Sequence, residues 1–147
     1  MAAGGGFLLA VLWFDLMFDA QARRDRSPRL TEPVLASITA YYRRVTTDAR
    51  PMNRLVAAAM LGTLAATIVE LTTSDVDARA AWVSLVLVVA AVAIAATRTV
   101  PNAVRLGSRR DPPDEQSRLA RRILGDHLAC FTLIATLVVV QLVSAVT

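Results

Sequence analysis

The chain has 147 residues, of which 55% are hydrophobic, and its mean hydropathy is +0.49. An ordinary soluble domain of this length is less apolar, so we expect the lipid bilayer to be the chain's solvent. All 16 basic residues are arginines that lie mostly between apolar runs, a pattern that describes membrane topology and argues against a nucleic-acid partner despite the net charge of +4.

Four stretches are long and apolar enough to cross a bilayer, whose hydrocarbon core is about 30 Å thick and requires about 20 apolar residues per helix. They cover residues 2–18, 52–71, 80–99 and 123–146. The first stretch lacks the basic start and the small-residue cleavage site of a signal peptide, so we predict that it is retained. The expected fold is all-α, a single domain over 1–147 that forms an integral-membrane four-helix bundle.

The first loop has a helical pattern of its own. Thr31 and Pro33 lie where a helix would begin, and the residues that follow at helical spacing are Val34, Ile38, Tyr41, Tyr42 and Val45. We predict an amphipathic helix on the inner membrane interface, with the two tyrosines as interfacial anchors.

Prolines punctuate the third and fourth helices. Pro101 disfavours helical geometry at Val100, so the third helix is expected to end or kink there. Asp111 is predicted to cap the fourth helix, which would begin with Pro112 and Pro113 followed by acidic residues in its first turn.

The arginines predict the orientation in the membrane. In the first loop they are Arg23, Arg24, Arg26, Arg29, Arg43, Arg44 and Arg50, and in the third loop Arg105, Arg109, Arg110, Arg118, Arg121 and Arg122. The second loop has only Arg79. By the positive-inside rule the first and third loops are cytoplasmic and both termini are outside. Arginine without lysine, together with abundant alanine and valine, is typical of a GC-rich bacterial genome, so we expect a bacterial cytoplasmic membrane.

With this topology the polar residues in or beside the spans gather at the cytoplasmic end. They are Asp15, Asp19, Asn53, Arg54, Thr97, Arg98, Thr99, Asn102, Asp126 and His127. Residues at one depth of a four-helix bundle can face a common cavity. The candidate substrate-binding residues are Asp15, Asp19, Asn53, Arg54 and Arg98.

Of these residues, Asp15 costs the most free energy to place in the membrane, because a charge within a span must find a partner or water. Asp19 lies one helical turn further on and shares its face. By depth, Arg54 and Arg98 are the nearest candidate counter-ions. The alternative is a purely structural salt bridge that joins the first helix to its neighbours.

His127 is the only histidine and the candidate general base or proton shuttle. It shares a helical stripe with Leu119, Ile123, Cys130 and Ile134, which is predicted to face the bundle interior. A histidine that merely bonds a helix end is the alternative. A lone histidine and a lone, packed Cys130 give little support to a metal site or a disulfide, and we expect no metal and no cofactor.

The segment Thr97-Arg98-Thr99-Val100-Pro101-Asn102-Ala103-Val104-Arg105-Leu106, with His127 at the head of the fourth helix, resembles the anthrone oxygenase-like family of small four-helix membrane proteins. The resemblance implies oxidation of an anthrone-type polyphenol by dioxygen without a cofactor. In that mechanism Thr97 and Asn102 position the substrate and His127 removes a proton. The run from Trp13 to Asp19 has no counterpart in the family's pattern.

Three functions therefore remain open. The first is a cofactor-independent oxygenase that acts on an aromatic small molecule. The second is a non-enzymatic accessory subunit, as a homo-oligomer or within a larger membrane complex, whose alanine-rich third helix packs closely against a partner. A proton-coupled transporter that uses Asp15 is the weakest, because no inverted repeat is evident.

Overall fold

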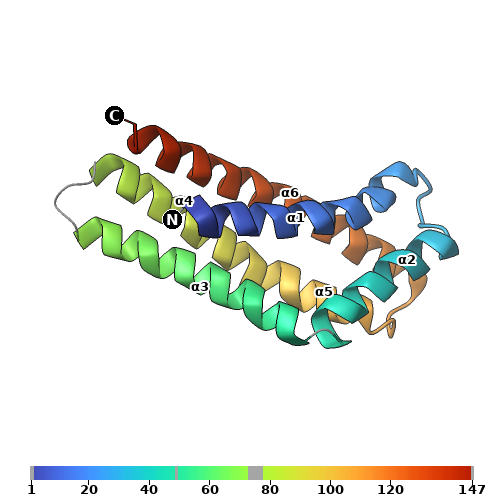
Figure 1. Cartoon of the computed structure of the whole chain (residues 1–147). Coiled ribbons are helices and arrows are strands. Elements are labelled where there is room, and N and C mark those ends of the chain that lie inside the picture. The colour runs from blue at the N-terminus through green and yellow to red at the C-terminus, as the bar shows by residue number, and fades with distance from the viewer. Residues whose placement is uncertain (1, 49, 73–77, 147) are drawn as a thin grey trace.

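The computed structural model describes residues 2–48, 50–72 and 78–146. Helices account for nearly all of them (Figure 1). In chain order the elements are α1 (Ala2–Arg24), α2 (Glu32–Arg43), the π-helical turn η1 (Arg44–Asp48), α3 (Arg50–Thr72), α4 (Ala78–Ile94), the π-helical turn η2 (Ala95–Thr99), α5 (Val100–Gly107) and α6 (Pro113–Ser144). No strand occurs in these ranges, which confirms the predicted all-α class.

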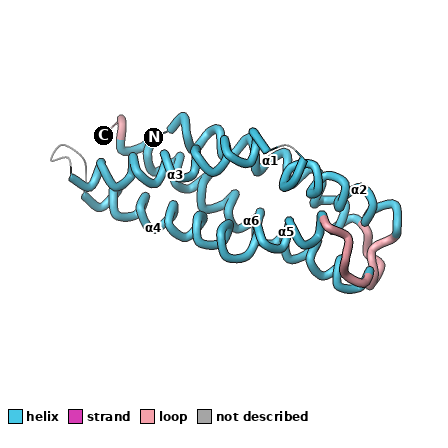
Figure 2. Tube along the Cα trace, turned by 90° about the horizontal axis from the view of Figure 1, so that it is seen from below, coloured by secondary structure: helices cyan, strands magenta, loops and turns pink. Residues whose placement is uncertain are grey.

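Four helical segments are long and apolar enough to cross a membrane, which confirms the predicted bundle. Neighbouring segments pack in a ring, in which α1 contacts α6, α6 contacts α4, α4 contacts α3 and α3 contacts α1. The start of α1 and the end of α6 lie at one end of the bundle, and α2 lies at the other (Figures 1 and 2). Each segment extends beyond the predicted span at one end or both; α1, for example, continues to Arg24.

The first and third loops meet at the α2 end of the bundle. Arg29 pairs with Asp114 at 3.6 Å and Arg109 with Glu32 at 2.5 Å. The side chain of Arg121 also donates to the carbonyl of Ser27. These pairs are exposed and contribute little stability individually. They nevertheless place both arginine-rich loops at one end, as an even number of crossings requires.

The helix predicted in the first loop exists, but its apolar face is covered by protein. Leu35, Ile38 and Tyr42 of α2 are at most 2% exposed and pack with Leu106 of α5 and Ile123 of α6. A helix lying on the membrane interface would instead leave this face to lipid. The prediction that Tyr42 is an interfacial anchor is therefore wrong, because its side chain is buried in the protein core.

The third helix does not end at Val100, and Val100 is not extended, so this part of the prediction was wrong. Val100 has φ −62° and ψ −49°, and the helix is continuous from Ala78 to Gly107. Pro101 lacks an N–H and would crowd the carbonyl four residues earlier in a regular helix. The wider π-helical turn η2, directly before it, relieves that contact.

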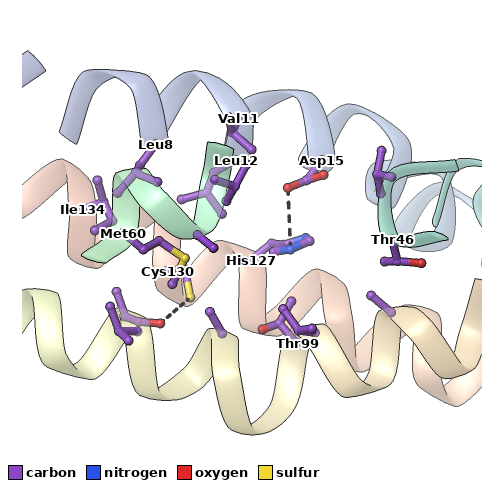
Figure 3. A pocket seen from close by; sticks show the side chains of 18 of the residues that line it. Leu8, Val11, Leu12, Asp15, Thr46, Met60, Thr99, His127, Cys130 and Ile134 are labelled. Carbon is purple, nitrogen blue, oxygen red and sulfur yellow. Dashed lines mark hydrogen bonds and ion pairs between the residues drawn. The ribbon is translucent and has the colours of Figure 1, made fainter. Parts of the chain in front are cut away.

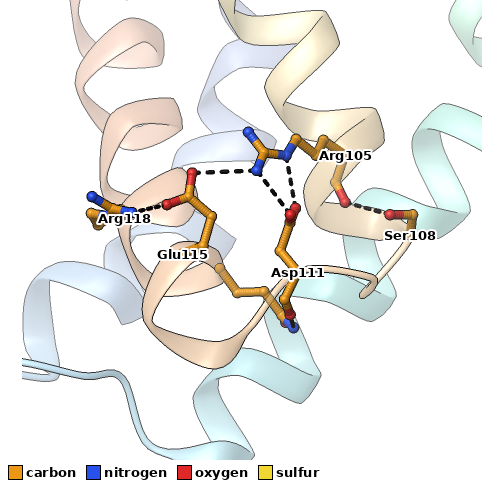
Figure 4. Close-up of polar contacts among 6 residues, drawn as sticks. Arg105, Ser108, Asp111, Glu115 and Arg118 are labelled. Atoms are coloured by element: carbon orange, nitrogen blue, oxygen red, sulfur yellow. Dashed lines mark hydrogen bonds and ion pairs between the residues drawn. The ribbon is translucent and has the colours of Figure 1, made fainter.

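Asp111 does not cap α6, which corrects the expectation from the sequence. The N-cap position is Pro112, without a capping side chain. The Asp111 carboxylate instead accepts two hydrogen bonds of 2.8 Å from Arg105 (Figure 4). Glu115, in the first turn of α6, lies 3.5 Å from the same guanidinium. The two acids thereby tie the end of α5 to the start of α6.

Candidate functional site

A cavity of about 340 Å³ lies inside the ring of helices, in the half nearer to α2 (Figure 3). Its wall is mostly aliphatic. Short side chains leave this space, because α4, η2 and α5 contribute Ala91, Ala95 and Ala103 to the wall where larger residues would fill the core. The polar residues of the wall are Asp15, Tyr41, Tyr42, Thr46, Thr99 and His127.

His127 is held by a buried carboxylate. Its Nδ1 lies 2.7 Å from Oδ2 of Asp19, and the Tyr42 hydroxyl donates to Oδ1 of the same carboxylate at 2.6 Å. Asp19 is 1% exposed and does not line the cavity, so it contacts the imidazole from behind. α1, α2 and α6 each contribute one member of this triad.

Asp15 forms a second layer on the cavity side. The Tyr41 hydroxyl donates to its Oδ1 at 2.6 Å, and its Oδ2 lies 3.8 Å from Nε2 of His127 (Figure 3). The ring of Tyr41 stacks on Phe18, with 4.0 Å between centroids, which fixes the phenol beside α1. Both ring nitrogens of His127 thus face a carboxylate, at unequal distances.

The unequal distances determine the tautomer of a neutral imidazole. A carboxylate 2.7 Å from Nδ1 requires a proton on that nitrogen, so Nδ1–H donates to Asp19. Nε2, on the opposite side of the ring, then carries the free lone pair beside the cavity. An imidazole whose second nitrogen is bonded to a carboxylate is the arrangement that serves as a general base.

The two tyrosines serve the cluster as neutral donors. Burial and the nearby carboxylates of Asp15 and Asp19 raise the pKa of Tyr41 and of Tyr42 well above its ordinary value. Both phenols therefore stay protonated at physiological pH, and each satisfies one carboxylate oxygen in a site that is largely shielded from water.

The predicted counter-ions differ from the observed ones. Arg98 pairs with Asp126 at 2.8 Å, whereas Asp15 and Asp19 bond the phenols and the imidazole. Arg54 is exposed and is not part of the cavity wall. The second carboxylate oxygen of Asp126 is buried without a partner among the described residues.

The structure brings some of the predicted site residues together and separates others. Asp15 and His127 share the cavity, with Asp19 directly behind, and Thr99 is a wall residue. Thr97 is exposed, bonds the carbonyl of Ala93 at 2.6 Å and does not line the cavity. Asn102 is half-buried and also lies outside the wall. The side chain of Asn53 lies outside the described part of the structure.

Sequence reasoning missed Tyr41 and Tyr42 as site residues. Their only signal was two adjacent phenols in a loop helix with an apolar face, which fits a membrane anchor equally well. Only the packing of α2 against α1 and α6 identifies the carboxylates and the imidazole as their partners.

No protein-family model, curated protein or solved structure matches the chain. Within residues 2–48, 50–72 and 78–146, no group of three or more His, Cys, Asp or Glu side chains is placed to hold a metal ion.

Proposed function

We propose that the chain is a membrane enzyme that removes a proton from an apolar, aromatic substrate in this cavity, as a cofactor-independent oxygenase does. The observation behind it is the Asp19–His127 pair, whose second imidazole nitrogen, 3.8 Å from Asp15, lies beside a mostly aliphatic cavity. An apolar wall with a few convergent polar groups is typical of a small-molecule site.

The chemistry balances with dioxygen as the oxidant. Nε2 of His127 takes a proton from the activated CH₂ group of an anthrone-type ring, and the carbanion transfers one electron to dioxygen. The substrate radical and superoxide combine, and the resulting peroxide takes the proton back from the imidazolium. Loss of the second C–H proton and cleavage of the O–O bond release water, so that CH₂ and O₂ become C=O and H₂O.

Asp19, Tyr42, Asp15 and Tyr41 have supporting roles in this proposal. Asp19 stabilises the imidazolium that forms when Nε2 is protonated, and Tyr42 fixes the orientation of Asp19. Asp15, 3.8 Å from Nε2, is placed to pass protons to and from the imidazole, with the Tyr41 hydroxyl bonded to its other oxygen. The contacts implied for Thr97 and Asn102 by the family resemblance have no support from the cavity wall.

The experiment measures anthrone oxidation by purified chain in lipid vesicles, as oxygen consumption and quinone absorbance. We expect His127→Ala to lower kcat/KM by about 10²–10⁴-fold, the contribution typical of a positioned general base. Thr132→Ala is the matched control, because Thr132 is exposed on α6 and its hydroxyl bonds the carbonyl of Leu128 in the same helix.

Equal rates for the parent and His127→Ala, with a clearly active parent, would remove His127 from the mechanism. An inactive parent that purifies in mild detergent with a stoichiometric partner would instead favour the accessory-subunit function.

A further inference from the structure

The cavity is closed toward the arginine-rich end of the bundle. Leu106, Leu119 and Ile123 are fully buried there and pack against the apolar face of α2. The end of α5 also meets the end of α2 at backbone distance, since a Cβ atom on Gly107 would lie 2.7 Å from the backbone nitrogen of Arg43. Water-soluble molecules therefore meet a packed apolar core at this end.

One side of the ring is less closed. Within the described ranges α3 packs against α1, α4 and η1, whereas no Cα atom of α3 lies within 8 Å of a Cα atom of η2 or α5. Side chains that border this gap line the cavity from both sides, with Ala57 on α3 and with Val100 and Val104 on α5. Val100 is 54% exposed and Val104 is 47% exposed, so the same valines face both the cavity and the surroundings.

We propose that the cavity fills sideways from the bilayer, through this gap between α3 and α5. Its ligand is then a membrane-dissolved apolar molecule that carries one hydroxyl or carbonyl group for Asp15 and His127. A charged or strongly polar ligand is disfavoured, because it would lose its hydration against aliphatic side chains at the gap. The inference rests on the proposed function in taking the cavity as the substrate site, and it adds the route and the class of ligand.

Cys130 offers a test that needs no turnover. It is the only cysteine of the chain and it lines the cavity. The chain in lipid vesicles is treated with N-phenylmaleimide, which partitions into lipid, or with a trimethylammonium methanethiosulfonate, which does not. The modified fraction is followed by intact mass, with protein denatured in SDS as the reference for complete modification.

We expect the lipid-soluble reagent to modify Cys130 in the folded chain and the charged reagent to leave it unmodified. Ala57→Trp and Val104→Trp narrow the gap. Each should slow modification by about tenfold or more, because the bulkier side chain raises the barrier that the reagent must cross to enter the cavity. Val86→Trp is the matched control, because Val86 is 64% exposed on α4 and lies outside the cavity wall. It should label at the parental rate.

Three results would overturn the proposal. The first is a modification rate equal to the parent's in both gap variants, and the second is faster modification by the charged reagent than by the lipid-soluble one. The third is no modification of the folded chain, either at Cys130 or at a second reporter, Thr99→Cys in a Cys130→Ala background. If the chain is modified through the gap but does not oxidise anthrone, the proposed function is wrong and the proposed route still holds. If the chain oxidises anthrone but Cys130 is modified only by the charged reagent, the proposed route is wrong and the proposed function still holds.

Discussion

The assignment of the His127 tautomer makes a prediction that is independent of any substrate. In the parent the Asp19 carboxylate accepts from Tyr42 and from Nδ1–H, so a neutral His127 has its lone pair on Nε2. Asp19→Asn replaces one acceptor oxygen by an NH₂ donor. We expect this substitution to move the imidazole proton from Nδ1 to Nε2 and so remove the lone pair beside the cavity.

The size of the effect follows from the hydrogen bonds of Tyr42. If the asparagine oxygen stayed on Nδ1–H, its NH₂ would face the phenol and leave the buried Tyr42 proton without an acceptor, which costs about 1–3 kcal/mol. If the NH₂ instead donates to Nδ1, the amide oxygen still accepts from Tyr42 and every group is satisfied. The Nε2–H form should therefore be favoured by about 5- to 150-fold.

The assay is ¹⁵N NMR of histidine-labelled chain in lipid or detergent, at a pH where the ring is neutral. The chain has a single histidine, so each spectrum reports one ring, and protonated and unprotonated ring nitrogens resonate far apart. Asp15→Asn is the matched control, because Asp15 lies on the Nε2 side and its loss should leave the proton on Nδ1. An unchanged tautomer in Asp19→Asn would show that the Asp19 carboxylate does not determine which nitrogen of His127 carries the proton.

Two further predictions concern stability. Gly107→Ala should destabilise the fold by about 1–3 kcal/mol, since the new Cβ would lie 2.7 Å from the backbone nitrogen of Arg43. Gly125→Ala should stabilise it by about 0.5–1 kcal/mol, because among the described residues a Cβ there would meet nothing within 4 Å beyond its own stretch of helix. SDS or thermal unfolding in detergent measures both changes, and equal effects would contradict the close packing of α5 on α2. Because the pKa values of Tyr41 and Tyr42 are raised in the folded state, that state binds the phenolic protons more tightly than the unfolded chain, and the free energy of unfolding should fall as pH rises above about 10. Ultraviolet absorbance should then detect tyrosinate at about pH 11 only after unfolding, and its appearance in the folded chain would place the phenols in water.

Prediction from the sequence was strongest where one stretch carries its own signal. The four spans follow from local hydropathy, and the inward stripe of His127 with Leu119, Ile123, Cys130 and Ile134 follows from helical periodicity; all five residues are buried. Depth along the spans also placed Asp15, Asp19 and His127 near one another. The tertiary structure adds which atoms meet.

Two of the failures concern the partner that a charged side chain pairs with, and a third concerns the helical register around η2. Asp111 pairs with Arg105 and does not cap the backbone of α6, and Arg98 pairs with Asp126 and not with Asp15. Thr97 lies within the π-helical turn η2 and Asn102 follows it, and neither residue lines the cavity wall. Such a turn offsets later residues from regular helical spacing. Hydropathy contains no information on that offset.

Hydropathy along the chain is sufficient to predict membrane-spanning helices, since about 20 consecutive apolar residues have few alternatives to a helix in lipid. It also determined which residues are costly enough in a span to require partners. The identity of those partners depends on helix packing, because α2 folds back against α1 and α6 and brings two phenols to two carboxylates and one imidazole. Contacts between residues 23 to 108 positions apart depend on how whole helices pack, and local patterns do not encode that packing.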